Sequence, residues 1–475
     1  MNYEIVVGLE VHAQLLTKTK LFCGCTTPFG DPPNTHGCPV CLGLPGALPV
    51  LNRRAAEMAV RIGLALNCGI NEKSVFARKN YFYPDLPKGY QISQYEIPVC
   101  GPGTLPITVD GEEKMIGITR VHLEEDAGKL IHDQDIDSLF DVNRCGTPLI
   151  EIVSEPDMRS PAEAYAYLTS LKQILEYLQI CDCNMEQGSL RCDANISIRP
   201  QGESKLGTKT EIKNMNSFRN LEKALEYEAA RQKEVLSSGG TVLQQTFLWD
   251  PVKNRSVPMR TKEDAHDYRY FPDPDLMPLI IETPWVEQLK TRLPELPATK
   301  RHRFMESYGL NATNADILTS SAGLAQYYEE TVAASSEPKA SANWIMGDIM
   351  RIINEKKVGG PFSLNVSAQR LGDLIKLIEK GSISAKAAKK VLQLMESEDK
   401  DAATVVKEQG LEQVSDTGAL QSEVQKVLDA NPGEVQRYKD GEKKLTSFFM
   451  GQVMKATRGK ANPKEVSTIL RNLLG

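Results

Sequence analysis

The segment LRCDANISIR, residues 190–199, alternates polar and apolar side chains from end to end. The segment EIVVGLEVHAQL, residues 4–15, alternates in the same way. Because a strand directs successive side chains to opposite faces, both segments predict strands with one face in a hydrophobic core and one polar face. The polar face of the first segment carries Arg191, Asp193, Asn195, Ser197 and Arg199.

Three regions of different character follow one another along the 475 residues. In 1–293, short strand-like runs between Gly, Pro and Asn clusters predict a large α+β domain built on a mixed sheet, with one clear helix from residue 161. Pro294 and Pro297 mark the next boundary, and helical spacing beyond them predicts an all-α domain over 294–408 and a small α-helical tail domain over 409–475. The expected fold class is therefore α+β followed by two helical domains.

Charge is distributed unevenly along this chain, whose formal net charge is −6. Residues 1–293 carry 31 basic and 39 acidic side chains, whereas 441–475 carry 7 basic and 2 acidic ones. A basic tail is suited to contact with phosphate, including that of a nucleic acid. No apolar run is long enough to cross a membrane, and no basic leader precedes an apolar stretch, so we expect a cytoplasmic protein without a membrane partner.

Carboxylates recur inside the strand-like segments. Gathered on one surface they would repel one another unless a hard cation neutralised them, and Mg²⁺ prefers oxygen ligands that it often shares with nucleotide phosphates. Taken singly, each fits a solvent-facing position of a half-exposed strand better than a metal site, so the hypothesis of a magnesium-dependent phosphoryl-transfer site rests on their number. The candidates are Glu10, Glu124, Glu125, Glu151, Asp193 and Glu211, with His12 on the same strand face as Glu10.

Several common active-site motifs are absent from the sequence. There is no G-x-x-x-x-G-K-[ST] loop and no G-x-G-x-x-G between a strand and a helix, which disfavours a P-loop or Rossmann enzyme. There is likewise no G-x-S-x-G nucleophile elbow and no H-E-x-x-H motif. Any ATP must therefore be held in another way, and we expect its phosphates to meet Arg191, Asn195 and Arg199 on the polar face.

Four of the ten cysteines form a compact motif: Cys23 and Cys25, then twelve residues, then Cys38 and Cys41. Two such pairs joined by Gly and Pro turns are typical of a tetrahedral zinc site. A closed shell of four sulfurs leaves no open position for chemistry, so the predicted Zn²⁺ is structural; the alternative is four reduced structural thiols. We expect the other six cysteines to be ordinary packing residues.

Eight motifs together resemble a known family, the B subunit of the GatCAB amidotransferases, from end to end. The last of them, GQVMKATRGKANPKEV, is similar to the tail domain shared with the YqeY proteins. The motifs are GLEVHAQL, RKNYFYPDLPKGYQISQYE, GITRVHLEEDAGK, GTPLIEIVSEPD, GSLRCDANIS, EIKNMNSF, DYRYFPDPDL and GQVMKATRGKANPKEV.

The resemblance implies a ligase that forms C–N bonds with glutamine as the amide donor. A cradle-shaped first domain would use ATP and Mg²⁺ to phosphorylate the side-chain carboxylate of glutamate or aspartate esterified to tRNA(Gln), tRNA(Asn) or both, and ammonia would then displace phosphate. The ammonia would arrive through a channel from a separate A subunit, an amidase, in a heterotrimer with a small C subunit. The helical and tail domains would bind the tRNA.

The family motifs also imply roles for individual residues. His12, Glu124 and Glu151 would surround one metal position. A second set would bind the catalytic magnesium: Glu10, Glu125, Asp193 and Glu211. A third set would line the ammonia channel or the surface between subunits, with a plain loop and core role as the alternative: Lys79, Tyr81, Lys88 and Tyr90.

Two other functions fit the same residues. In a non-catalytic tRNA-binding scaffold, the acidic strands would be ordinary surface, and the zinc motif and basic tail would do the binding. A free-standing ATP-dependent carboxylate–amine ligase acting on a small molecule would explain the magnesium site but would leave the tail domain without a role.

Overall fold

The structure, a computed structural model, describes residues 2–131, 136–259, 268–413, 417–457 and 460–475 and divides into two compact units, Met1–Leu296 and Pro297–Gly475. Unit 1 is built on an eight-stranded sheet that is antiparallel except between β11 and β12. The predicted α+β fold class is confirmed. In spatial order the strands are β13 (Arg255–Pro258), β12 (Thr246–Asp250), β11 (Thr210–Lys213), β10 (Leu190–Pro200), β1 (Tyr3–Gln14), β9 (Pro148–Ser154), β6 (Glu112–Glu125) and β5 (Gly103–Val109).

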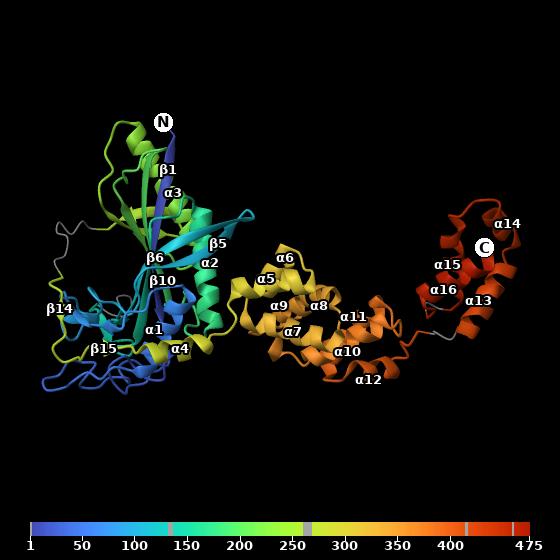
Figure 1. The fold of residues 1–475 in the computed structure, drawn as a ribbon, viewed down its shortest axis with the longest axis horizontal. Helices are drawn as coiled ribbons and strands as arrows, with labels where there is room; N and C mark the ends of the chain where they lie inside the picture. The colour runs from blue at the N-terminus through green and yellow to red at the C-terminus, as the bar shows by residue number, and fades with distance from the viewer. Residues whose placement is uncertain (1, 132–135, 260–267, 414–416, 458–459) are drawn as a thin grey trace. The chain divides into compact units, whose positions relative to one another are not determined.

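Helices cover the apolar face of the sheet. Helix α2 (Pro161–Tyr177) packs against β5, and α3 (Phe218–Ser237) packs against β10 (Figure 1). The predicted helix from residue 161 is confirmed as α2, whose first turn is capped by the Ser160 hydroxyl accepting from the Glu163 amide at 3.1 Å. Alternate side chains of β1 and β10 enter the hydrophobic core under these helices, which leaves the polar side chains on the opposite face.

The remaining elements of unit 1 surround the large sheet. A three-stranded sheet and two two-stranded sheets accompany it, and two further helices complete the unit. These elements are β2 (Lys73–Ser74), β3 (Ala77–Asn80), β4 (Tyr90–Ser93), β7 (Lys129–Ile131), β8 (Leu139–Asp141), β14 (Phe271–Pro272), β15 (Leu279–Ile280), α1 (Arg53–Ala65) and α4 (Thr283–Thr291).

Every regular element in the described part of unit 2 is helical, with two separate hydrophobic clusters, one between Phe304 and Val406 and one between Leu420 and Leu474. On this basis we propose that 294–408 and 409–475 are distinct domains. No helix of the described residues has the length and apolarity needed to span a membrane. The helices are α5 (Pro297–Tyr308), α6 (Ala312–Leu318), α7 (Ala322–Ser335), α8 (Pro338–Trp344), η1 (Ile345–Ile349), α9 (Met350–Lys356), η2 (Pro361–Ser363), α10 (Ala368–Glu379), α11 (Ala385–Glu398), α12 (Ala402–Glu408), α13 (Thr417–Asp429), α14 (Pro432–Lys439), α15 (Leu445–Ala456) and α16 (Pro463–Leu474).

Candidate active site and metal centre

Strand register gathers polar side chains from four neighbouring strands on the open face of the sheet. In the pairing of β1 with β10, Glu10 lies opposite Asp193 and His12 lies opposite Arg191. On the other side of β1, His12 lies opposite Glu151 of β9. The pairing of β9 with β6 then places His122 opposite Glu151. Directly opposed residues share a face, so these side chains form one continuous row.

Glu151 lies at the centre of this row and contacts both imidazoles. Its Oε2 atom is 3.3 Å from His12 Nε2 and 3.4 Å from His122 Nε2. His12 Nε2 is also 3.4 Å from Glu124 Oε1 and 3.8 Å from Glu10 Oε1. Two groups of potential metal ligands result, and they share Glu151: one with Glu10 and His12, the other with His122 and Glu124. The structure thus brings His12, Glu124 and Glu151 together.

Buried charges shift the pKa values of this cluster. Burial lowers the pKa of His122, but the charge of Glu151 and a hydrogen bond to Glu124 outweigh it and raise that pKa to about 9. Burial lowers the pKa of His12, but its hydrogen bond with Glu151 and the charges of the nearby carboxylates together outweigh burial and raise that pKa. Burial raises the pKa of Glu10, and the charge of Glu151 adds to it. A metal bound here would compete with the protons on the two imidazoles.

The cluster opens into a small pocket of about 120 Å³. Arg120 contributes to its wall, with Nη2 3.5 Å from Glu151 Oε1. Lys79 also lines it, with Nζ 4.7 Å from the centre of the Tyr268 ring and 5.7 Å from that of Tyr81. The pocket therefore combines two cationic side chains, Arg120 and Lys79, with the buried carboxylates of Glu124 and Glu151.

A second acidic group lies on β10 and β11. Lys213 Nζ is 2.5 Å from Asp193 Oδ2 and 3.0 Å from Glu211 Oε1. Burial lowers the pKa of Lys213, but these two carboxylates raise it above its ordinary value. Asn195 lies opposite Glu211 in the strand pairing, at the margin of the same group. The ammonium of Lys213 provides the positive charge that Asp193 and Glu211 share.

A larger cavity of about 650 Å³ adjoins this group. Arg191 and Asp193 line it together with Lys129 and Arg144, and Arg191 Nη2 donates to Asp126 Oδ1 at 3.0 Å. Three cationic side chains around one cavity can receive a polyphosphate. Arg199 lies elsewhere, because its Nε donates to Glu4 Oε2 at 2.6 Å and it borders a different hollow.

Glu125 does not lie with Glu10, Asp193 and Glu211. Glu124 and Glu125 are consecutive in β6, so they project to opposite faces of the strand. The Glu125 carboxylate is buried, pairs with Lys88 and accepts the Ile92 amide at 2.8 Å. It lines a separate pocket of about 230 Å³ with Lys88, Tyr90 and Cys41.

The sequence prediction missed four polar residues of these groups. His122 precedes Glu124 by two positions and Lys213 follows Glu211 by two, so alternation alone could have indicated both. Alternation could have indicated Arg120 as well, because it precedes His122 by two positions in β6. Asp126 carried no such signal, because it follows the end of β6 and its contact with Arg191 depends on the tertiary fold.

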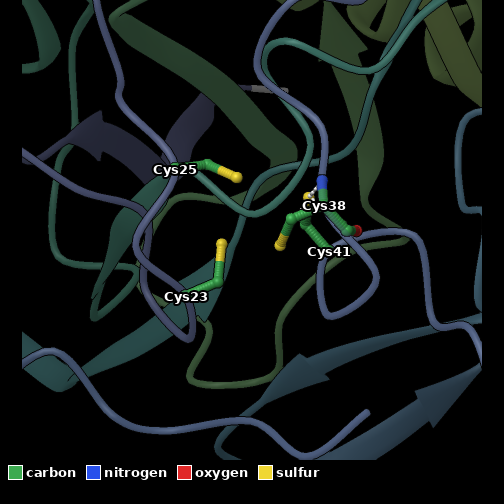
Figure 2. Close-up of side chains that lie close together, drawn as sticks. All are labelled: Cys23, Cys25, Cys38 and Cys41. Carbon is green, nitrogen blue, oxygen red and sulfur yellow. Dashed lines mark hydrogen bonds between the residues drawn. The ribbon is translucent and has the colours of Figure 1, made fainter.

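The four predicted zinc ligands converge in two loops (Figure 2). Their Sγ atoms all lie within 4.8 Å of one another, and those of Cys38 and Cys41 are 3.8 Å apart. Tetrahedral zinc with Zn–S bonds of about 2.3 Å requires sulfurs about 3.8 Å apart, so the arrangement fits this metal. A hydrogen bond from the Cys23 thiol lowers the pKa of Cys41 to about 4 and raises that of Cys23 above its ordinary value, so without a metal the proton of this pair stays on Cys23.

Residues 5–287, which include the sheet with its clustered carboxylates and histidines, match the family model described as the GatB/GatE catalytic domain. Residues 326–474 match a model described as the GatB domain. The chain belongs to the family of B subunits of aspartyl/glutamyl-tRNA(Asn/Gln) amidotransferases.

Relatives with that name cover the full length of the chain. The protein of Syntrophotalea carbinolica is 54% identical over 473 residues, which are 100% of this chain and 99% of the relative. That of Chlorobaculum tepidum is 54% identical over 474 residues and 100% of both chains. That of Carboxydothermus hydrogenoformans is 52% identical over 479 residues, 100% of this chain and 99% of the relative.

Proposed function

We propose that this chain activates and amidates the side-chain carboxylate of glutamate or aspartate carried on tRNA(Gln) or tRNA(Asn), as a ligase that uses ATP and a glutamine-derived ammonia. The observation that carries the proposal is the group of buried Glu124 and Glu151 with half-buried Glu10 and His12, on the sheet face that also borders a cavity with cationic walls. Neither a scaffold nor a plain sheet surface requires carboxylates and histidines to be buried together.

The chemistry requires two steps. A carboxylate oxygen of the substrate attacks the terminal phosphorus of ATP, ADP leaves, and an acyl phosphate forms. Ammonia then attacks the acyl carbon, phosphate leaves, and the amide remains after loss of a proton. Arg191, Arg144 and Lys129 surround the cavity in which the ATP phosphates would lie, and their fixed charges would offset the negative charge of the transferring group.

The acidic groups are suited to hold Mg²⁺ in two places. We propose His12, Glu124 and Glu151, with His122 from the same pocket, for one position. We propose Glu10, Asp193 and Glu211 for the catalytic position, without Glu125. Bound Mg²⁺ would supply charge neutralisation at the phosphoryl group. Lys213 would then have to release at least one of its two carboxylates.

Glu125 and Lys88 fit a different role. Their ion pair is almost completely buried, and with Tyr90 it lines the pocket on the other side of β6 from Glu124. A polar path of this kind would conduct ammonia from the amidase partner toward the acyl phosphate while excluding solvent. An inter-subunit surface is the alternative role for Lys88 and Tyr90.

The remaining parts of the chain would bind partners and stabilise the fold. The basic segment 441–475 would contact tRNA phosphate together with the helical domain. The small C subunit would complete a heterotrimer. The four-cysteine group would hold a structural Zn²⁺ with no open coordination position.

The test is amidation of glutamyl-tRNA(Gln) and of aspartyl-tRNA(Asn) by the full chain purified with its amidase partner and its small partner. Product should require ATP, Mg²⁺, glutamine and this chain. Asp193→Asn should lower the rate at least about 100-fold, since metal-assisted charge stabilisation contributes several kcal/mol. Asp110→Asn, in an exposed turn, is the matched control.

The outcomes separate the three functions. Binding of tRNA without ATP hydrolysis or product would favour the scaffold. Amidation of a free carboxylic acid, but of neither charged tRNA, would favour the free-standing ligase. An Asp193→Asn enzyme as active as the Asp110→Asn enzyme would refute the assignment of the site.

A further inference from the structure

Lys20 is a buried cation behind the cysteine group. Its side chain is 0% exposed, although lysine is among the residues least often buried. Its Nζ donates to the carbonyl oxygens of His36 at 2.6 Å and Val142 at 3.2 Å, and it lies 3.8 Å from Cys41 Sγ. No carboxylate of the described residues forms an ion pair with it. Two carbonyl dipoles are therefore its partners besides the sulfur.

A buried ammonium is costly unless an anion accompanies it. Four thiolates around one Zn²⁺ carry a net charge of −2, and the sulfur of Cys41 is the one next to Lys20. We infer that Lys20 is the counter-cation of the four-cysteine metal site, a positioning residue that stabilises the metal-bound thiolates. This inference rests on the proposed zinc occupancy and adds a residue outside the ligand motif.

A purely structural role for Lys20 is the competing explanation. Val142 lies in the segment that follows β8, and the loop before Cys38 is fastened to the same segment, because the His36 amide donates to Asn143 Oδ1 at 2.9 Å. Lys20 would then only join two loops. The two explanations differ in what Lys20 does when no metal is bound. A bridge stabilises the protein equally with and without zinc, whereas a counter-cation contributes more stability when four metal-bound thiolates are present.

The first experiment measures zinc retention in the full-length chain. Zinc content is determined by mass spectrometry, and zinc release to excess chelator is followed with a chromogenic indicator. Lys20→Met should release zinc about 10- to 100-fold faster than wild type, the range for lost partners of metal ligands. Lys20→Arg, which keeps the charge, should retain zinc better than Lys20→Met. Lys18→Met is the control, because Lys18 is exposed two positions away.

The second experiment compares thermal unfolding of zinc-loaded and chelator-stripped protein. Lys20→Met should lower the melting temperature of the loaded form more than that of the stripped form. Lys20→Gln, which can still hydrogen-bond to the carbonyls, gives the same comparison if the methionine variant does not fold.

Each result decides the inference. An equal loss of melting temperature in both forms would show that Lys20 is only a bridge. If the wild-type protein binds zinc but releases it as fast as Lys20→Met does, the proposed role of Lys20 is wrong and the zinc assignment stands. Wild-type protein that binds no zinc would overturn the zinc assignment and this inference together.

Discussion

Replacing Glu151 by Gln tests the centre of the candidate site, because it removes one negative charge and keeps the size of the side chain. The carboxylate is 3.3 and 3.4 Å from the two imidazoles. At an effective dielectric constant of about 20, each such pair is worth about 5 kcal/mol before desolvation. Removing one partner of a buried pair typically costs about 3–5 kcal/mol, so the metal-free protein should lose that much unfolding free energy at pH 6.

The assay is urea unfolding with chelator present, at pH 6 and at pH 10. Burial lowers the pKa of His122, but the charge of Glu151 is the main cause that raises it to about 9. The pKa of His122 should therefore fall in Glu151→Gln. At pH 10, above the pKa of His122, that imidazole is mainly neutral in both proteins, so its contribution to the difference in stability should shrink. Amidation should fall at least about 100-fold. Glu112→Gln, exposed on β6, is the control.

A Glu151→Gln protein with wild-type stability at pH 6 would refute the electrostatic reasoning. It would mean that His12 and His122 are neutral in the metal-free protein. Wild-type amidation with reduced stability would instead make Glu151 a structural residue and would remove the proposed metal position that it forms with His12, Glu124 and His122.

Three other predictions concern separate parts of the molecule. In metal-free wild type, protonated His122 should contribute about 3 kcal/mol of stability below pH 6.5, and this should be lost as the pH rises through about 9, seen by urea unfolding across that range. Lys88→Met leaves Glu125 buried without its partner and should cost about 3–5 kcal/mol in denaturant unfolding, whereas Lys88→Arg should cost less. Removing 409–475 should weaken tRNA binding at least about tenfold in a filter assay while ATP hydrolysis persists.

The polar face of the sheet could be predicted from the sequence because alternation is a local property. Glu10 shares a face with His12, and Arg191 shares one with Asp193, whatever surrounds the strands. Which strands are neighbours could not be obtained in this way. The register that places Glu10 opposite Asp193 joins positions 183 residues apart, and it depends on the packing of the whole core.

The cysteine motif shows the same limit on a smaller scale. Its spacing indicated four converging thiols, and their sulfurs do lie within 4.8 Å of one another. The neighbouring cation was not predictable, since Lys20 lies in a polar stretch, TKTK, in which exposure is the ordinary expectation. Only the fold places its ammonium between the carbonyls of His36 and Val142.

Glu124 and Glu125 explain how one strand can serve two pockets. Glu124 lines the acidic pocket with His122, and Glu125 lines the pocket with Lys88, although the two are adjacent in the sequence. A strand end is the simplest element that can achieve this, because a one-residue step reverses the side-chain direction without moving the backbone. The two adjacent acidic residues therefore line two different pockets, one on each side of β6.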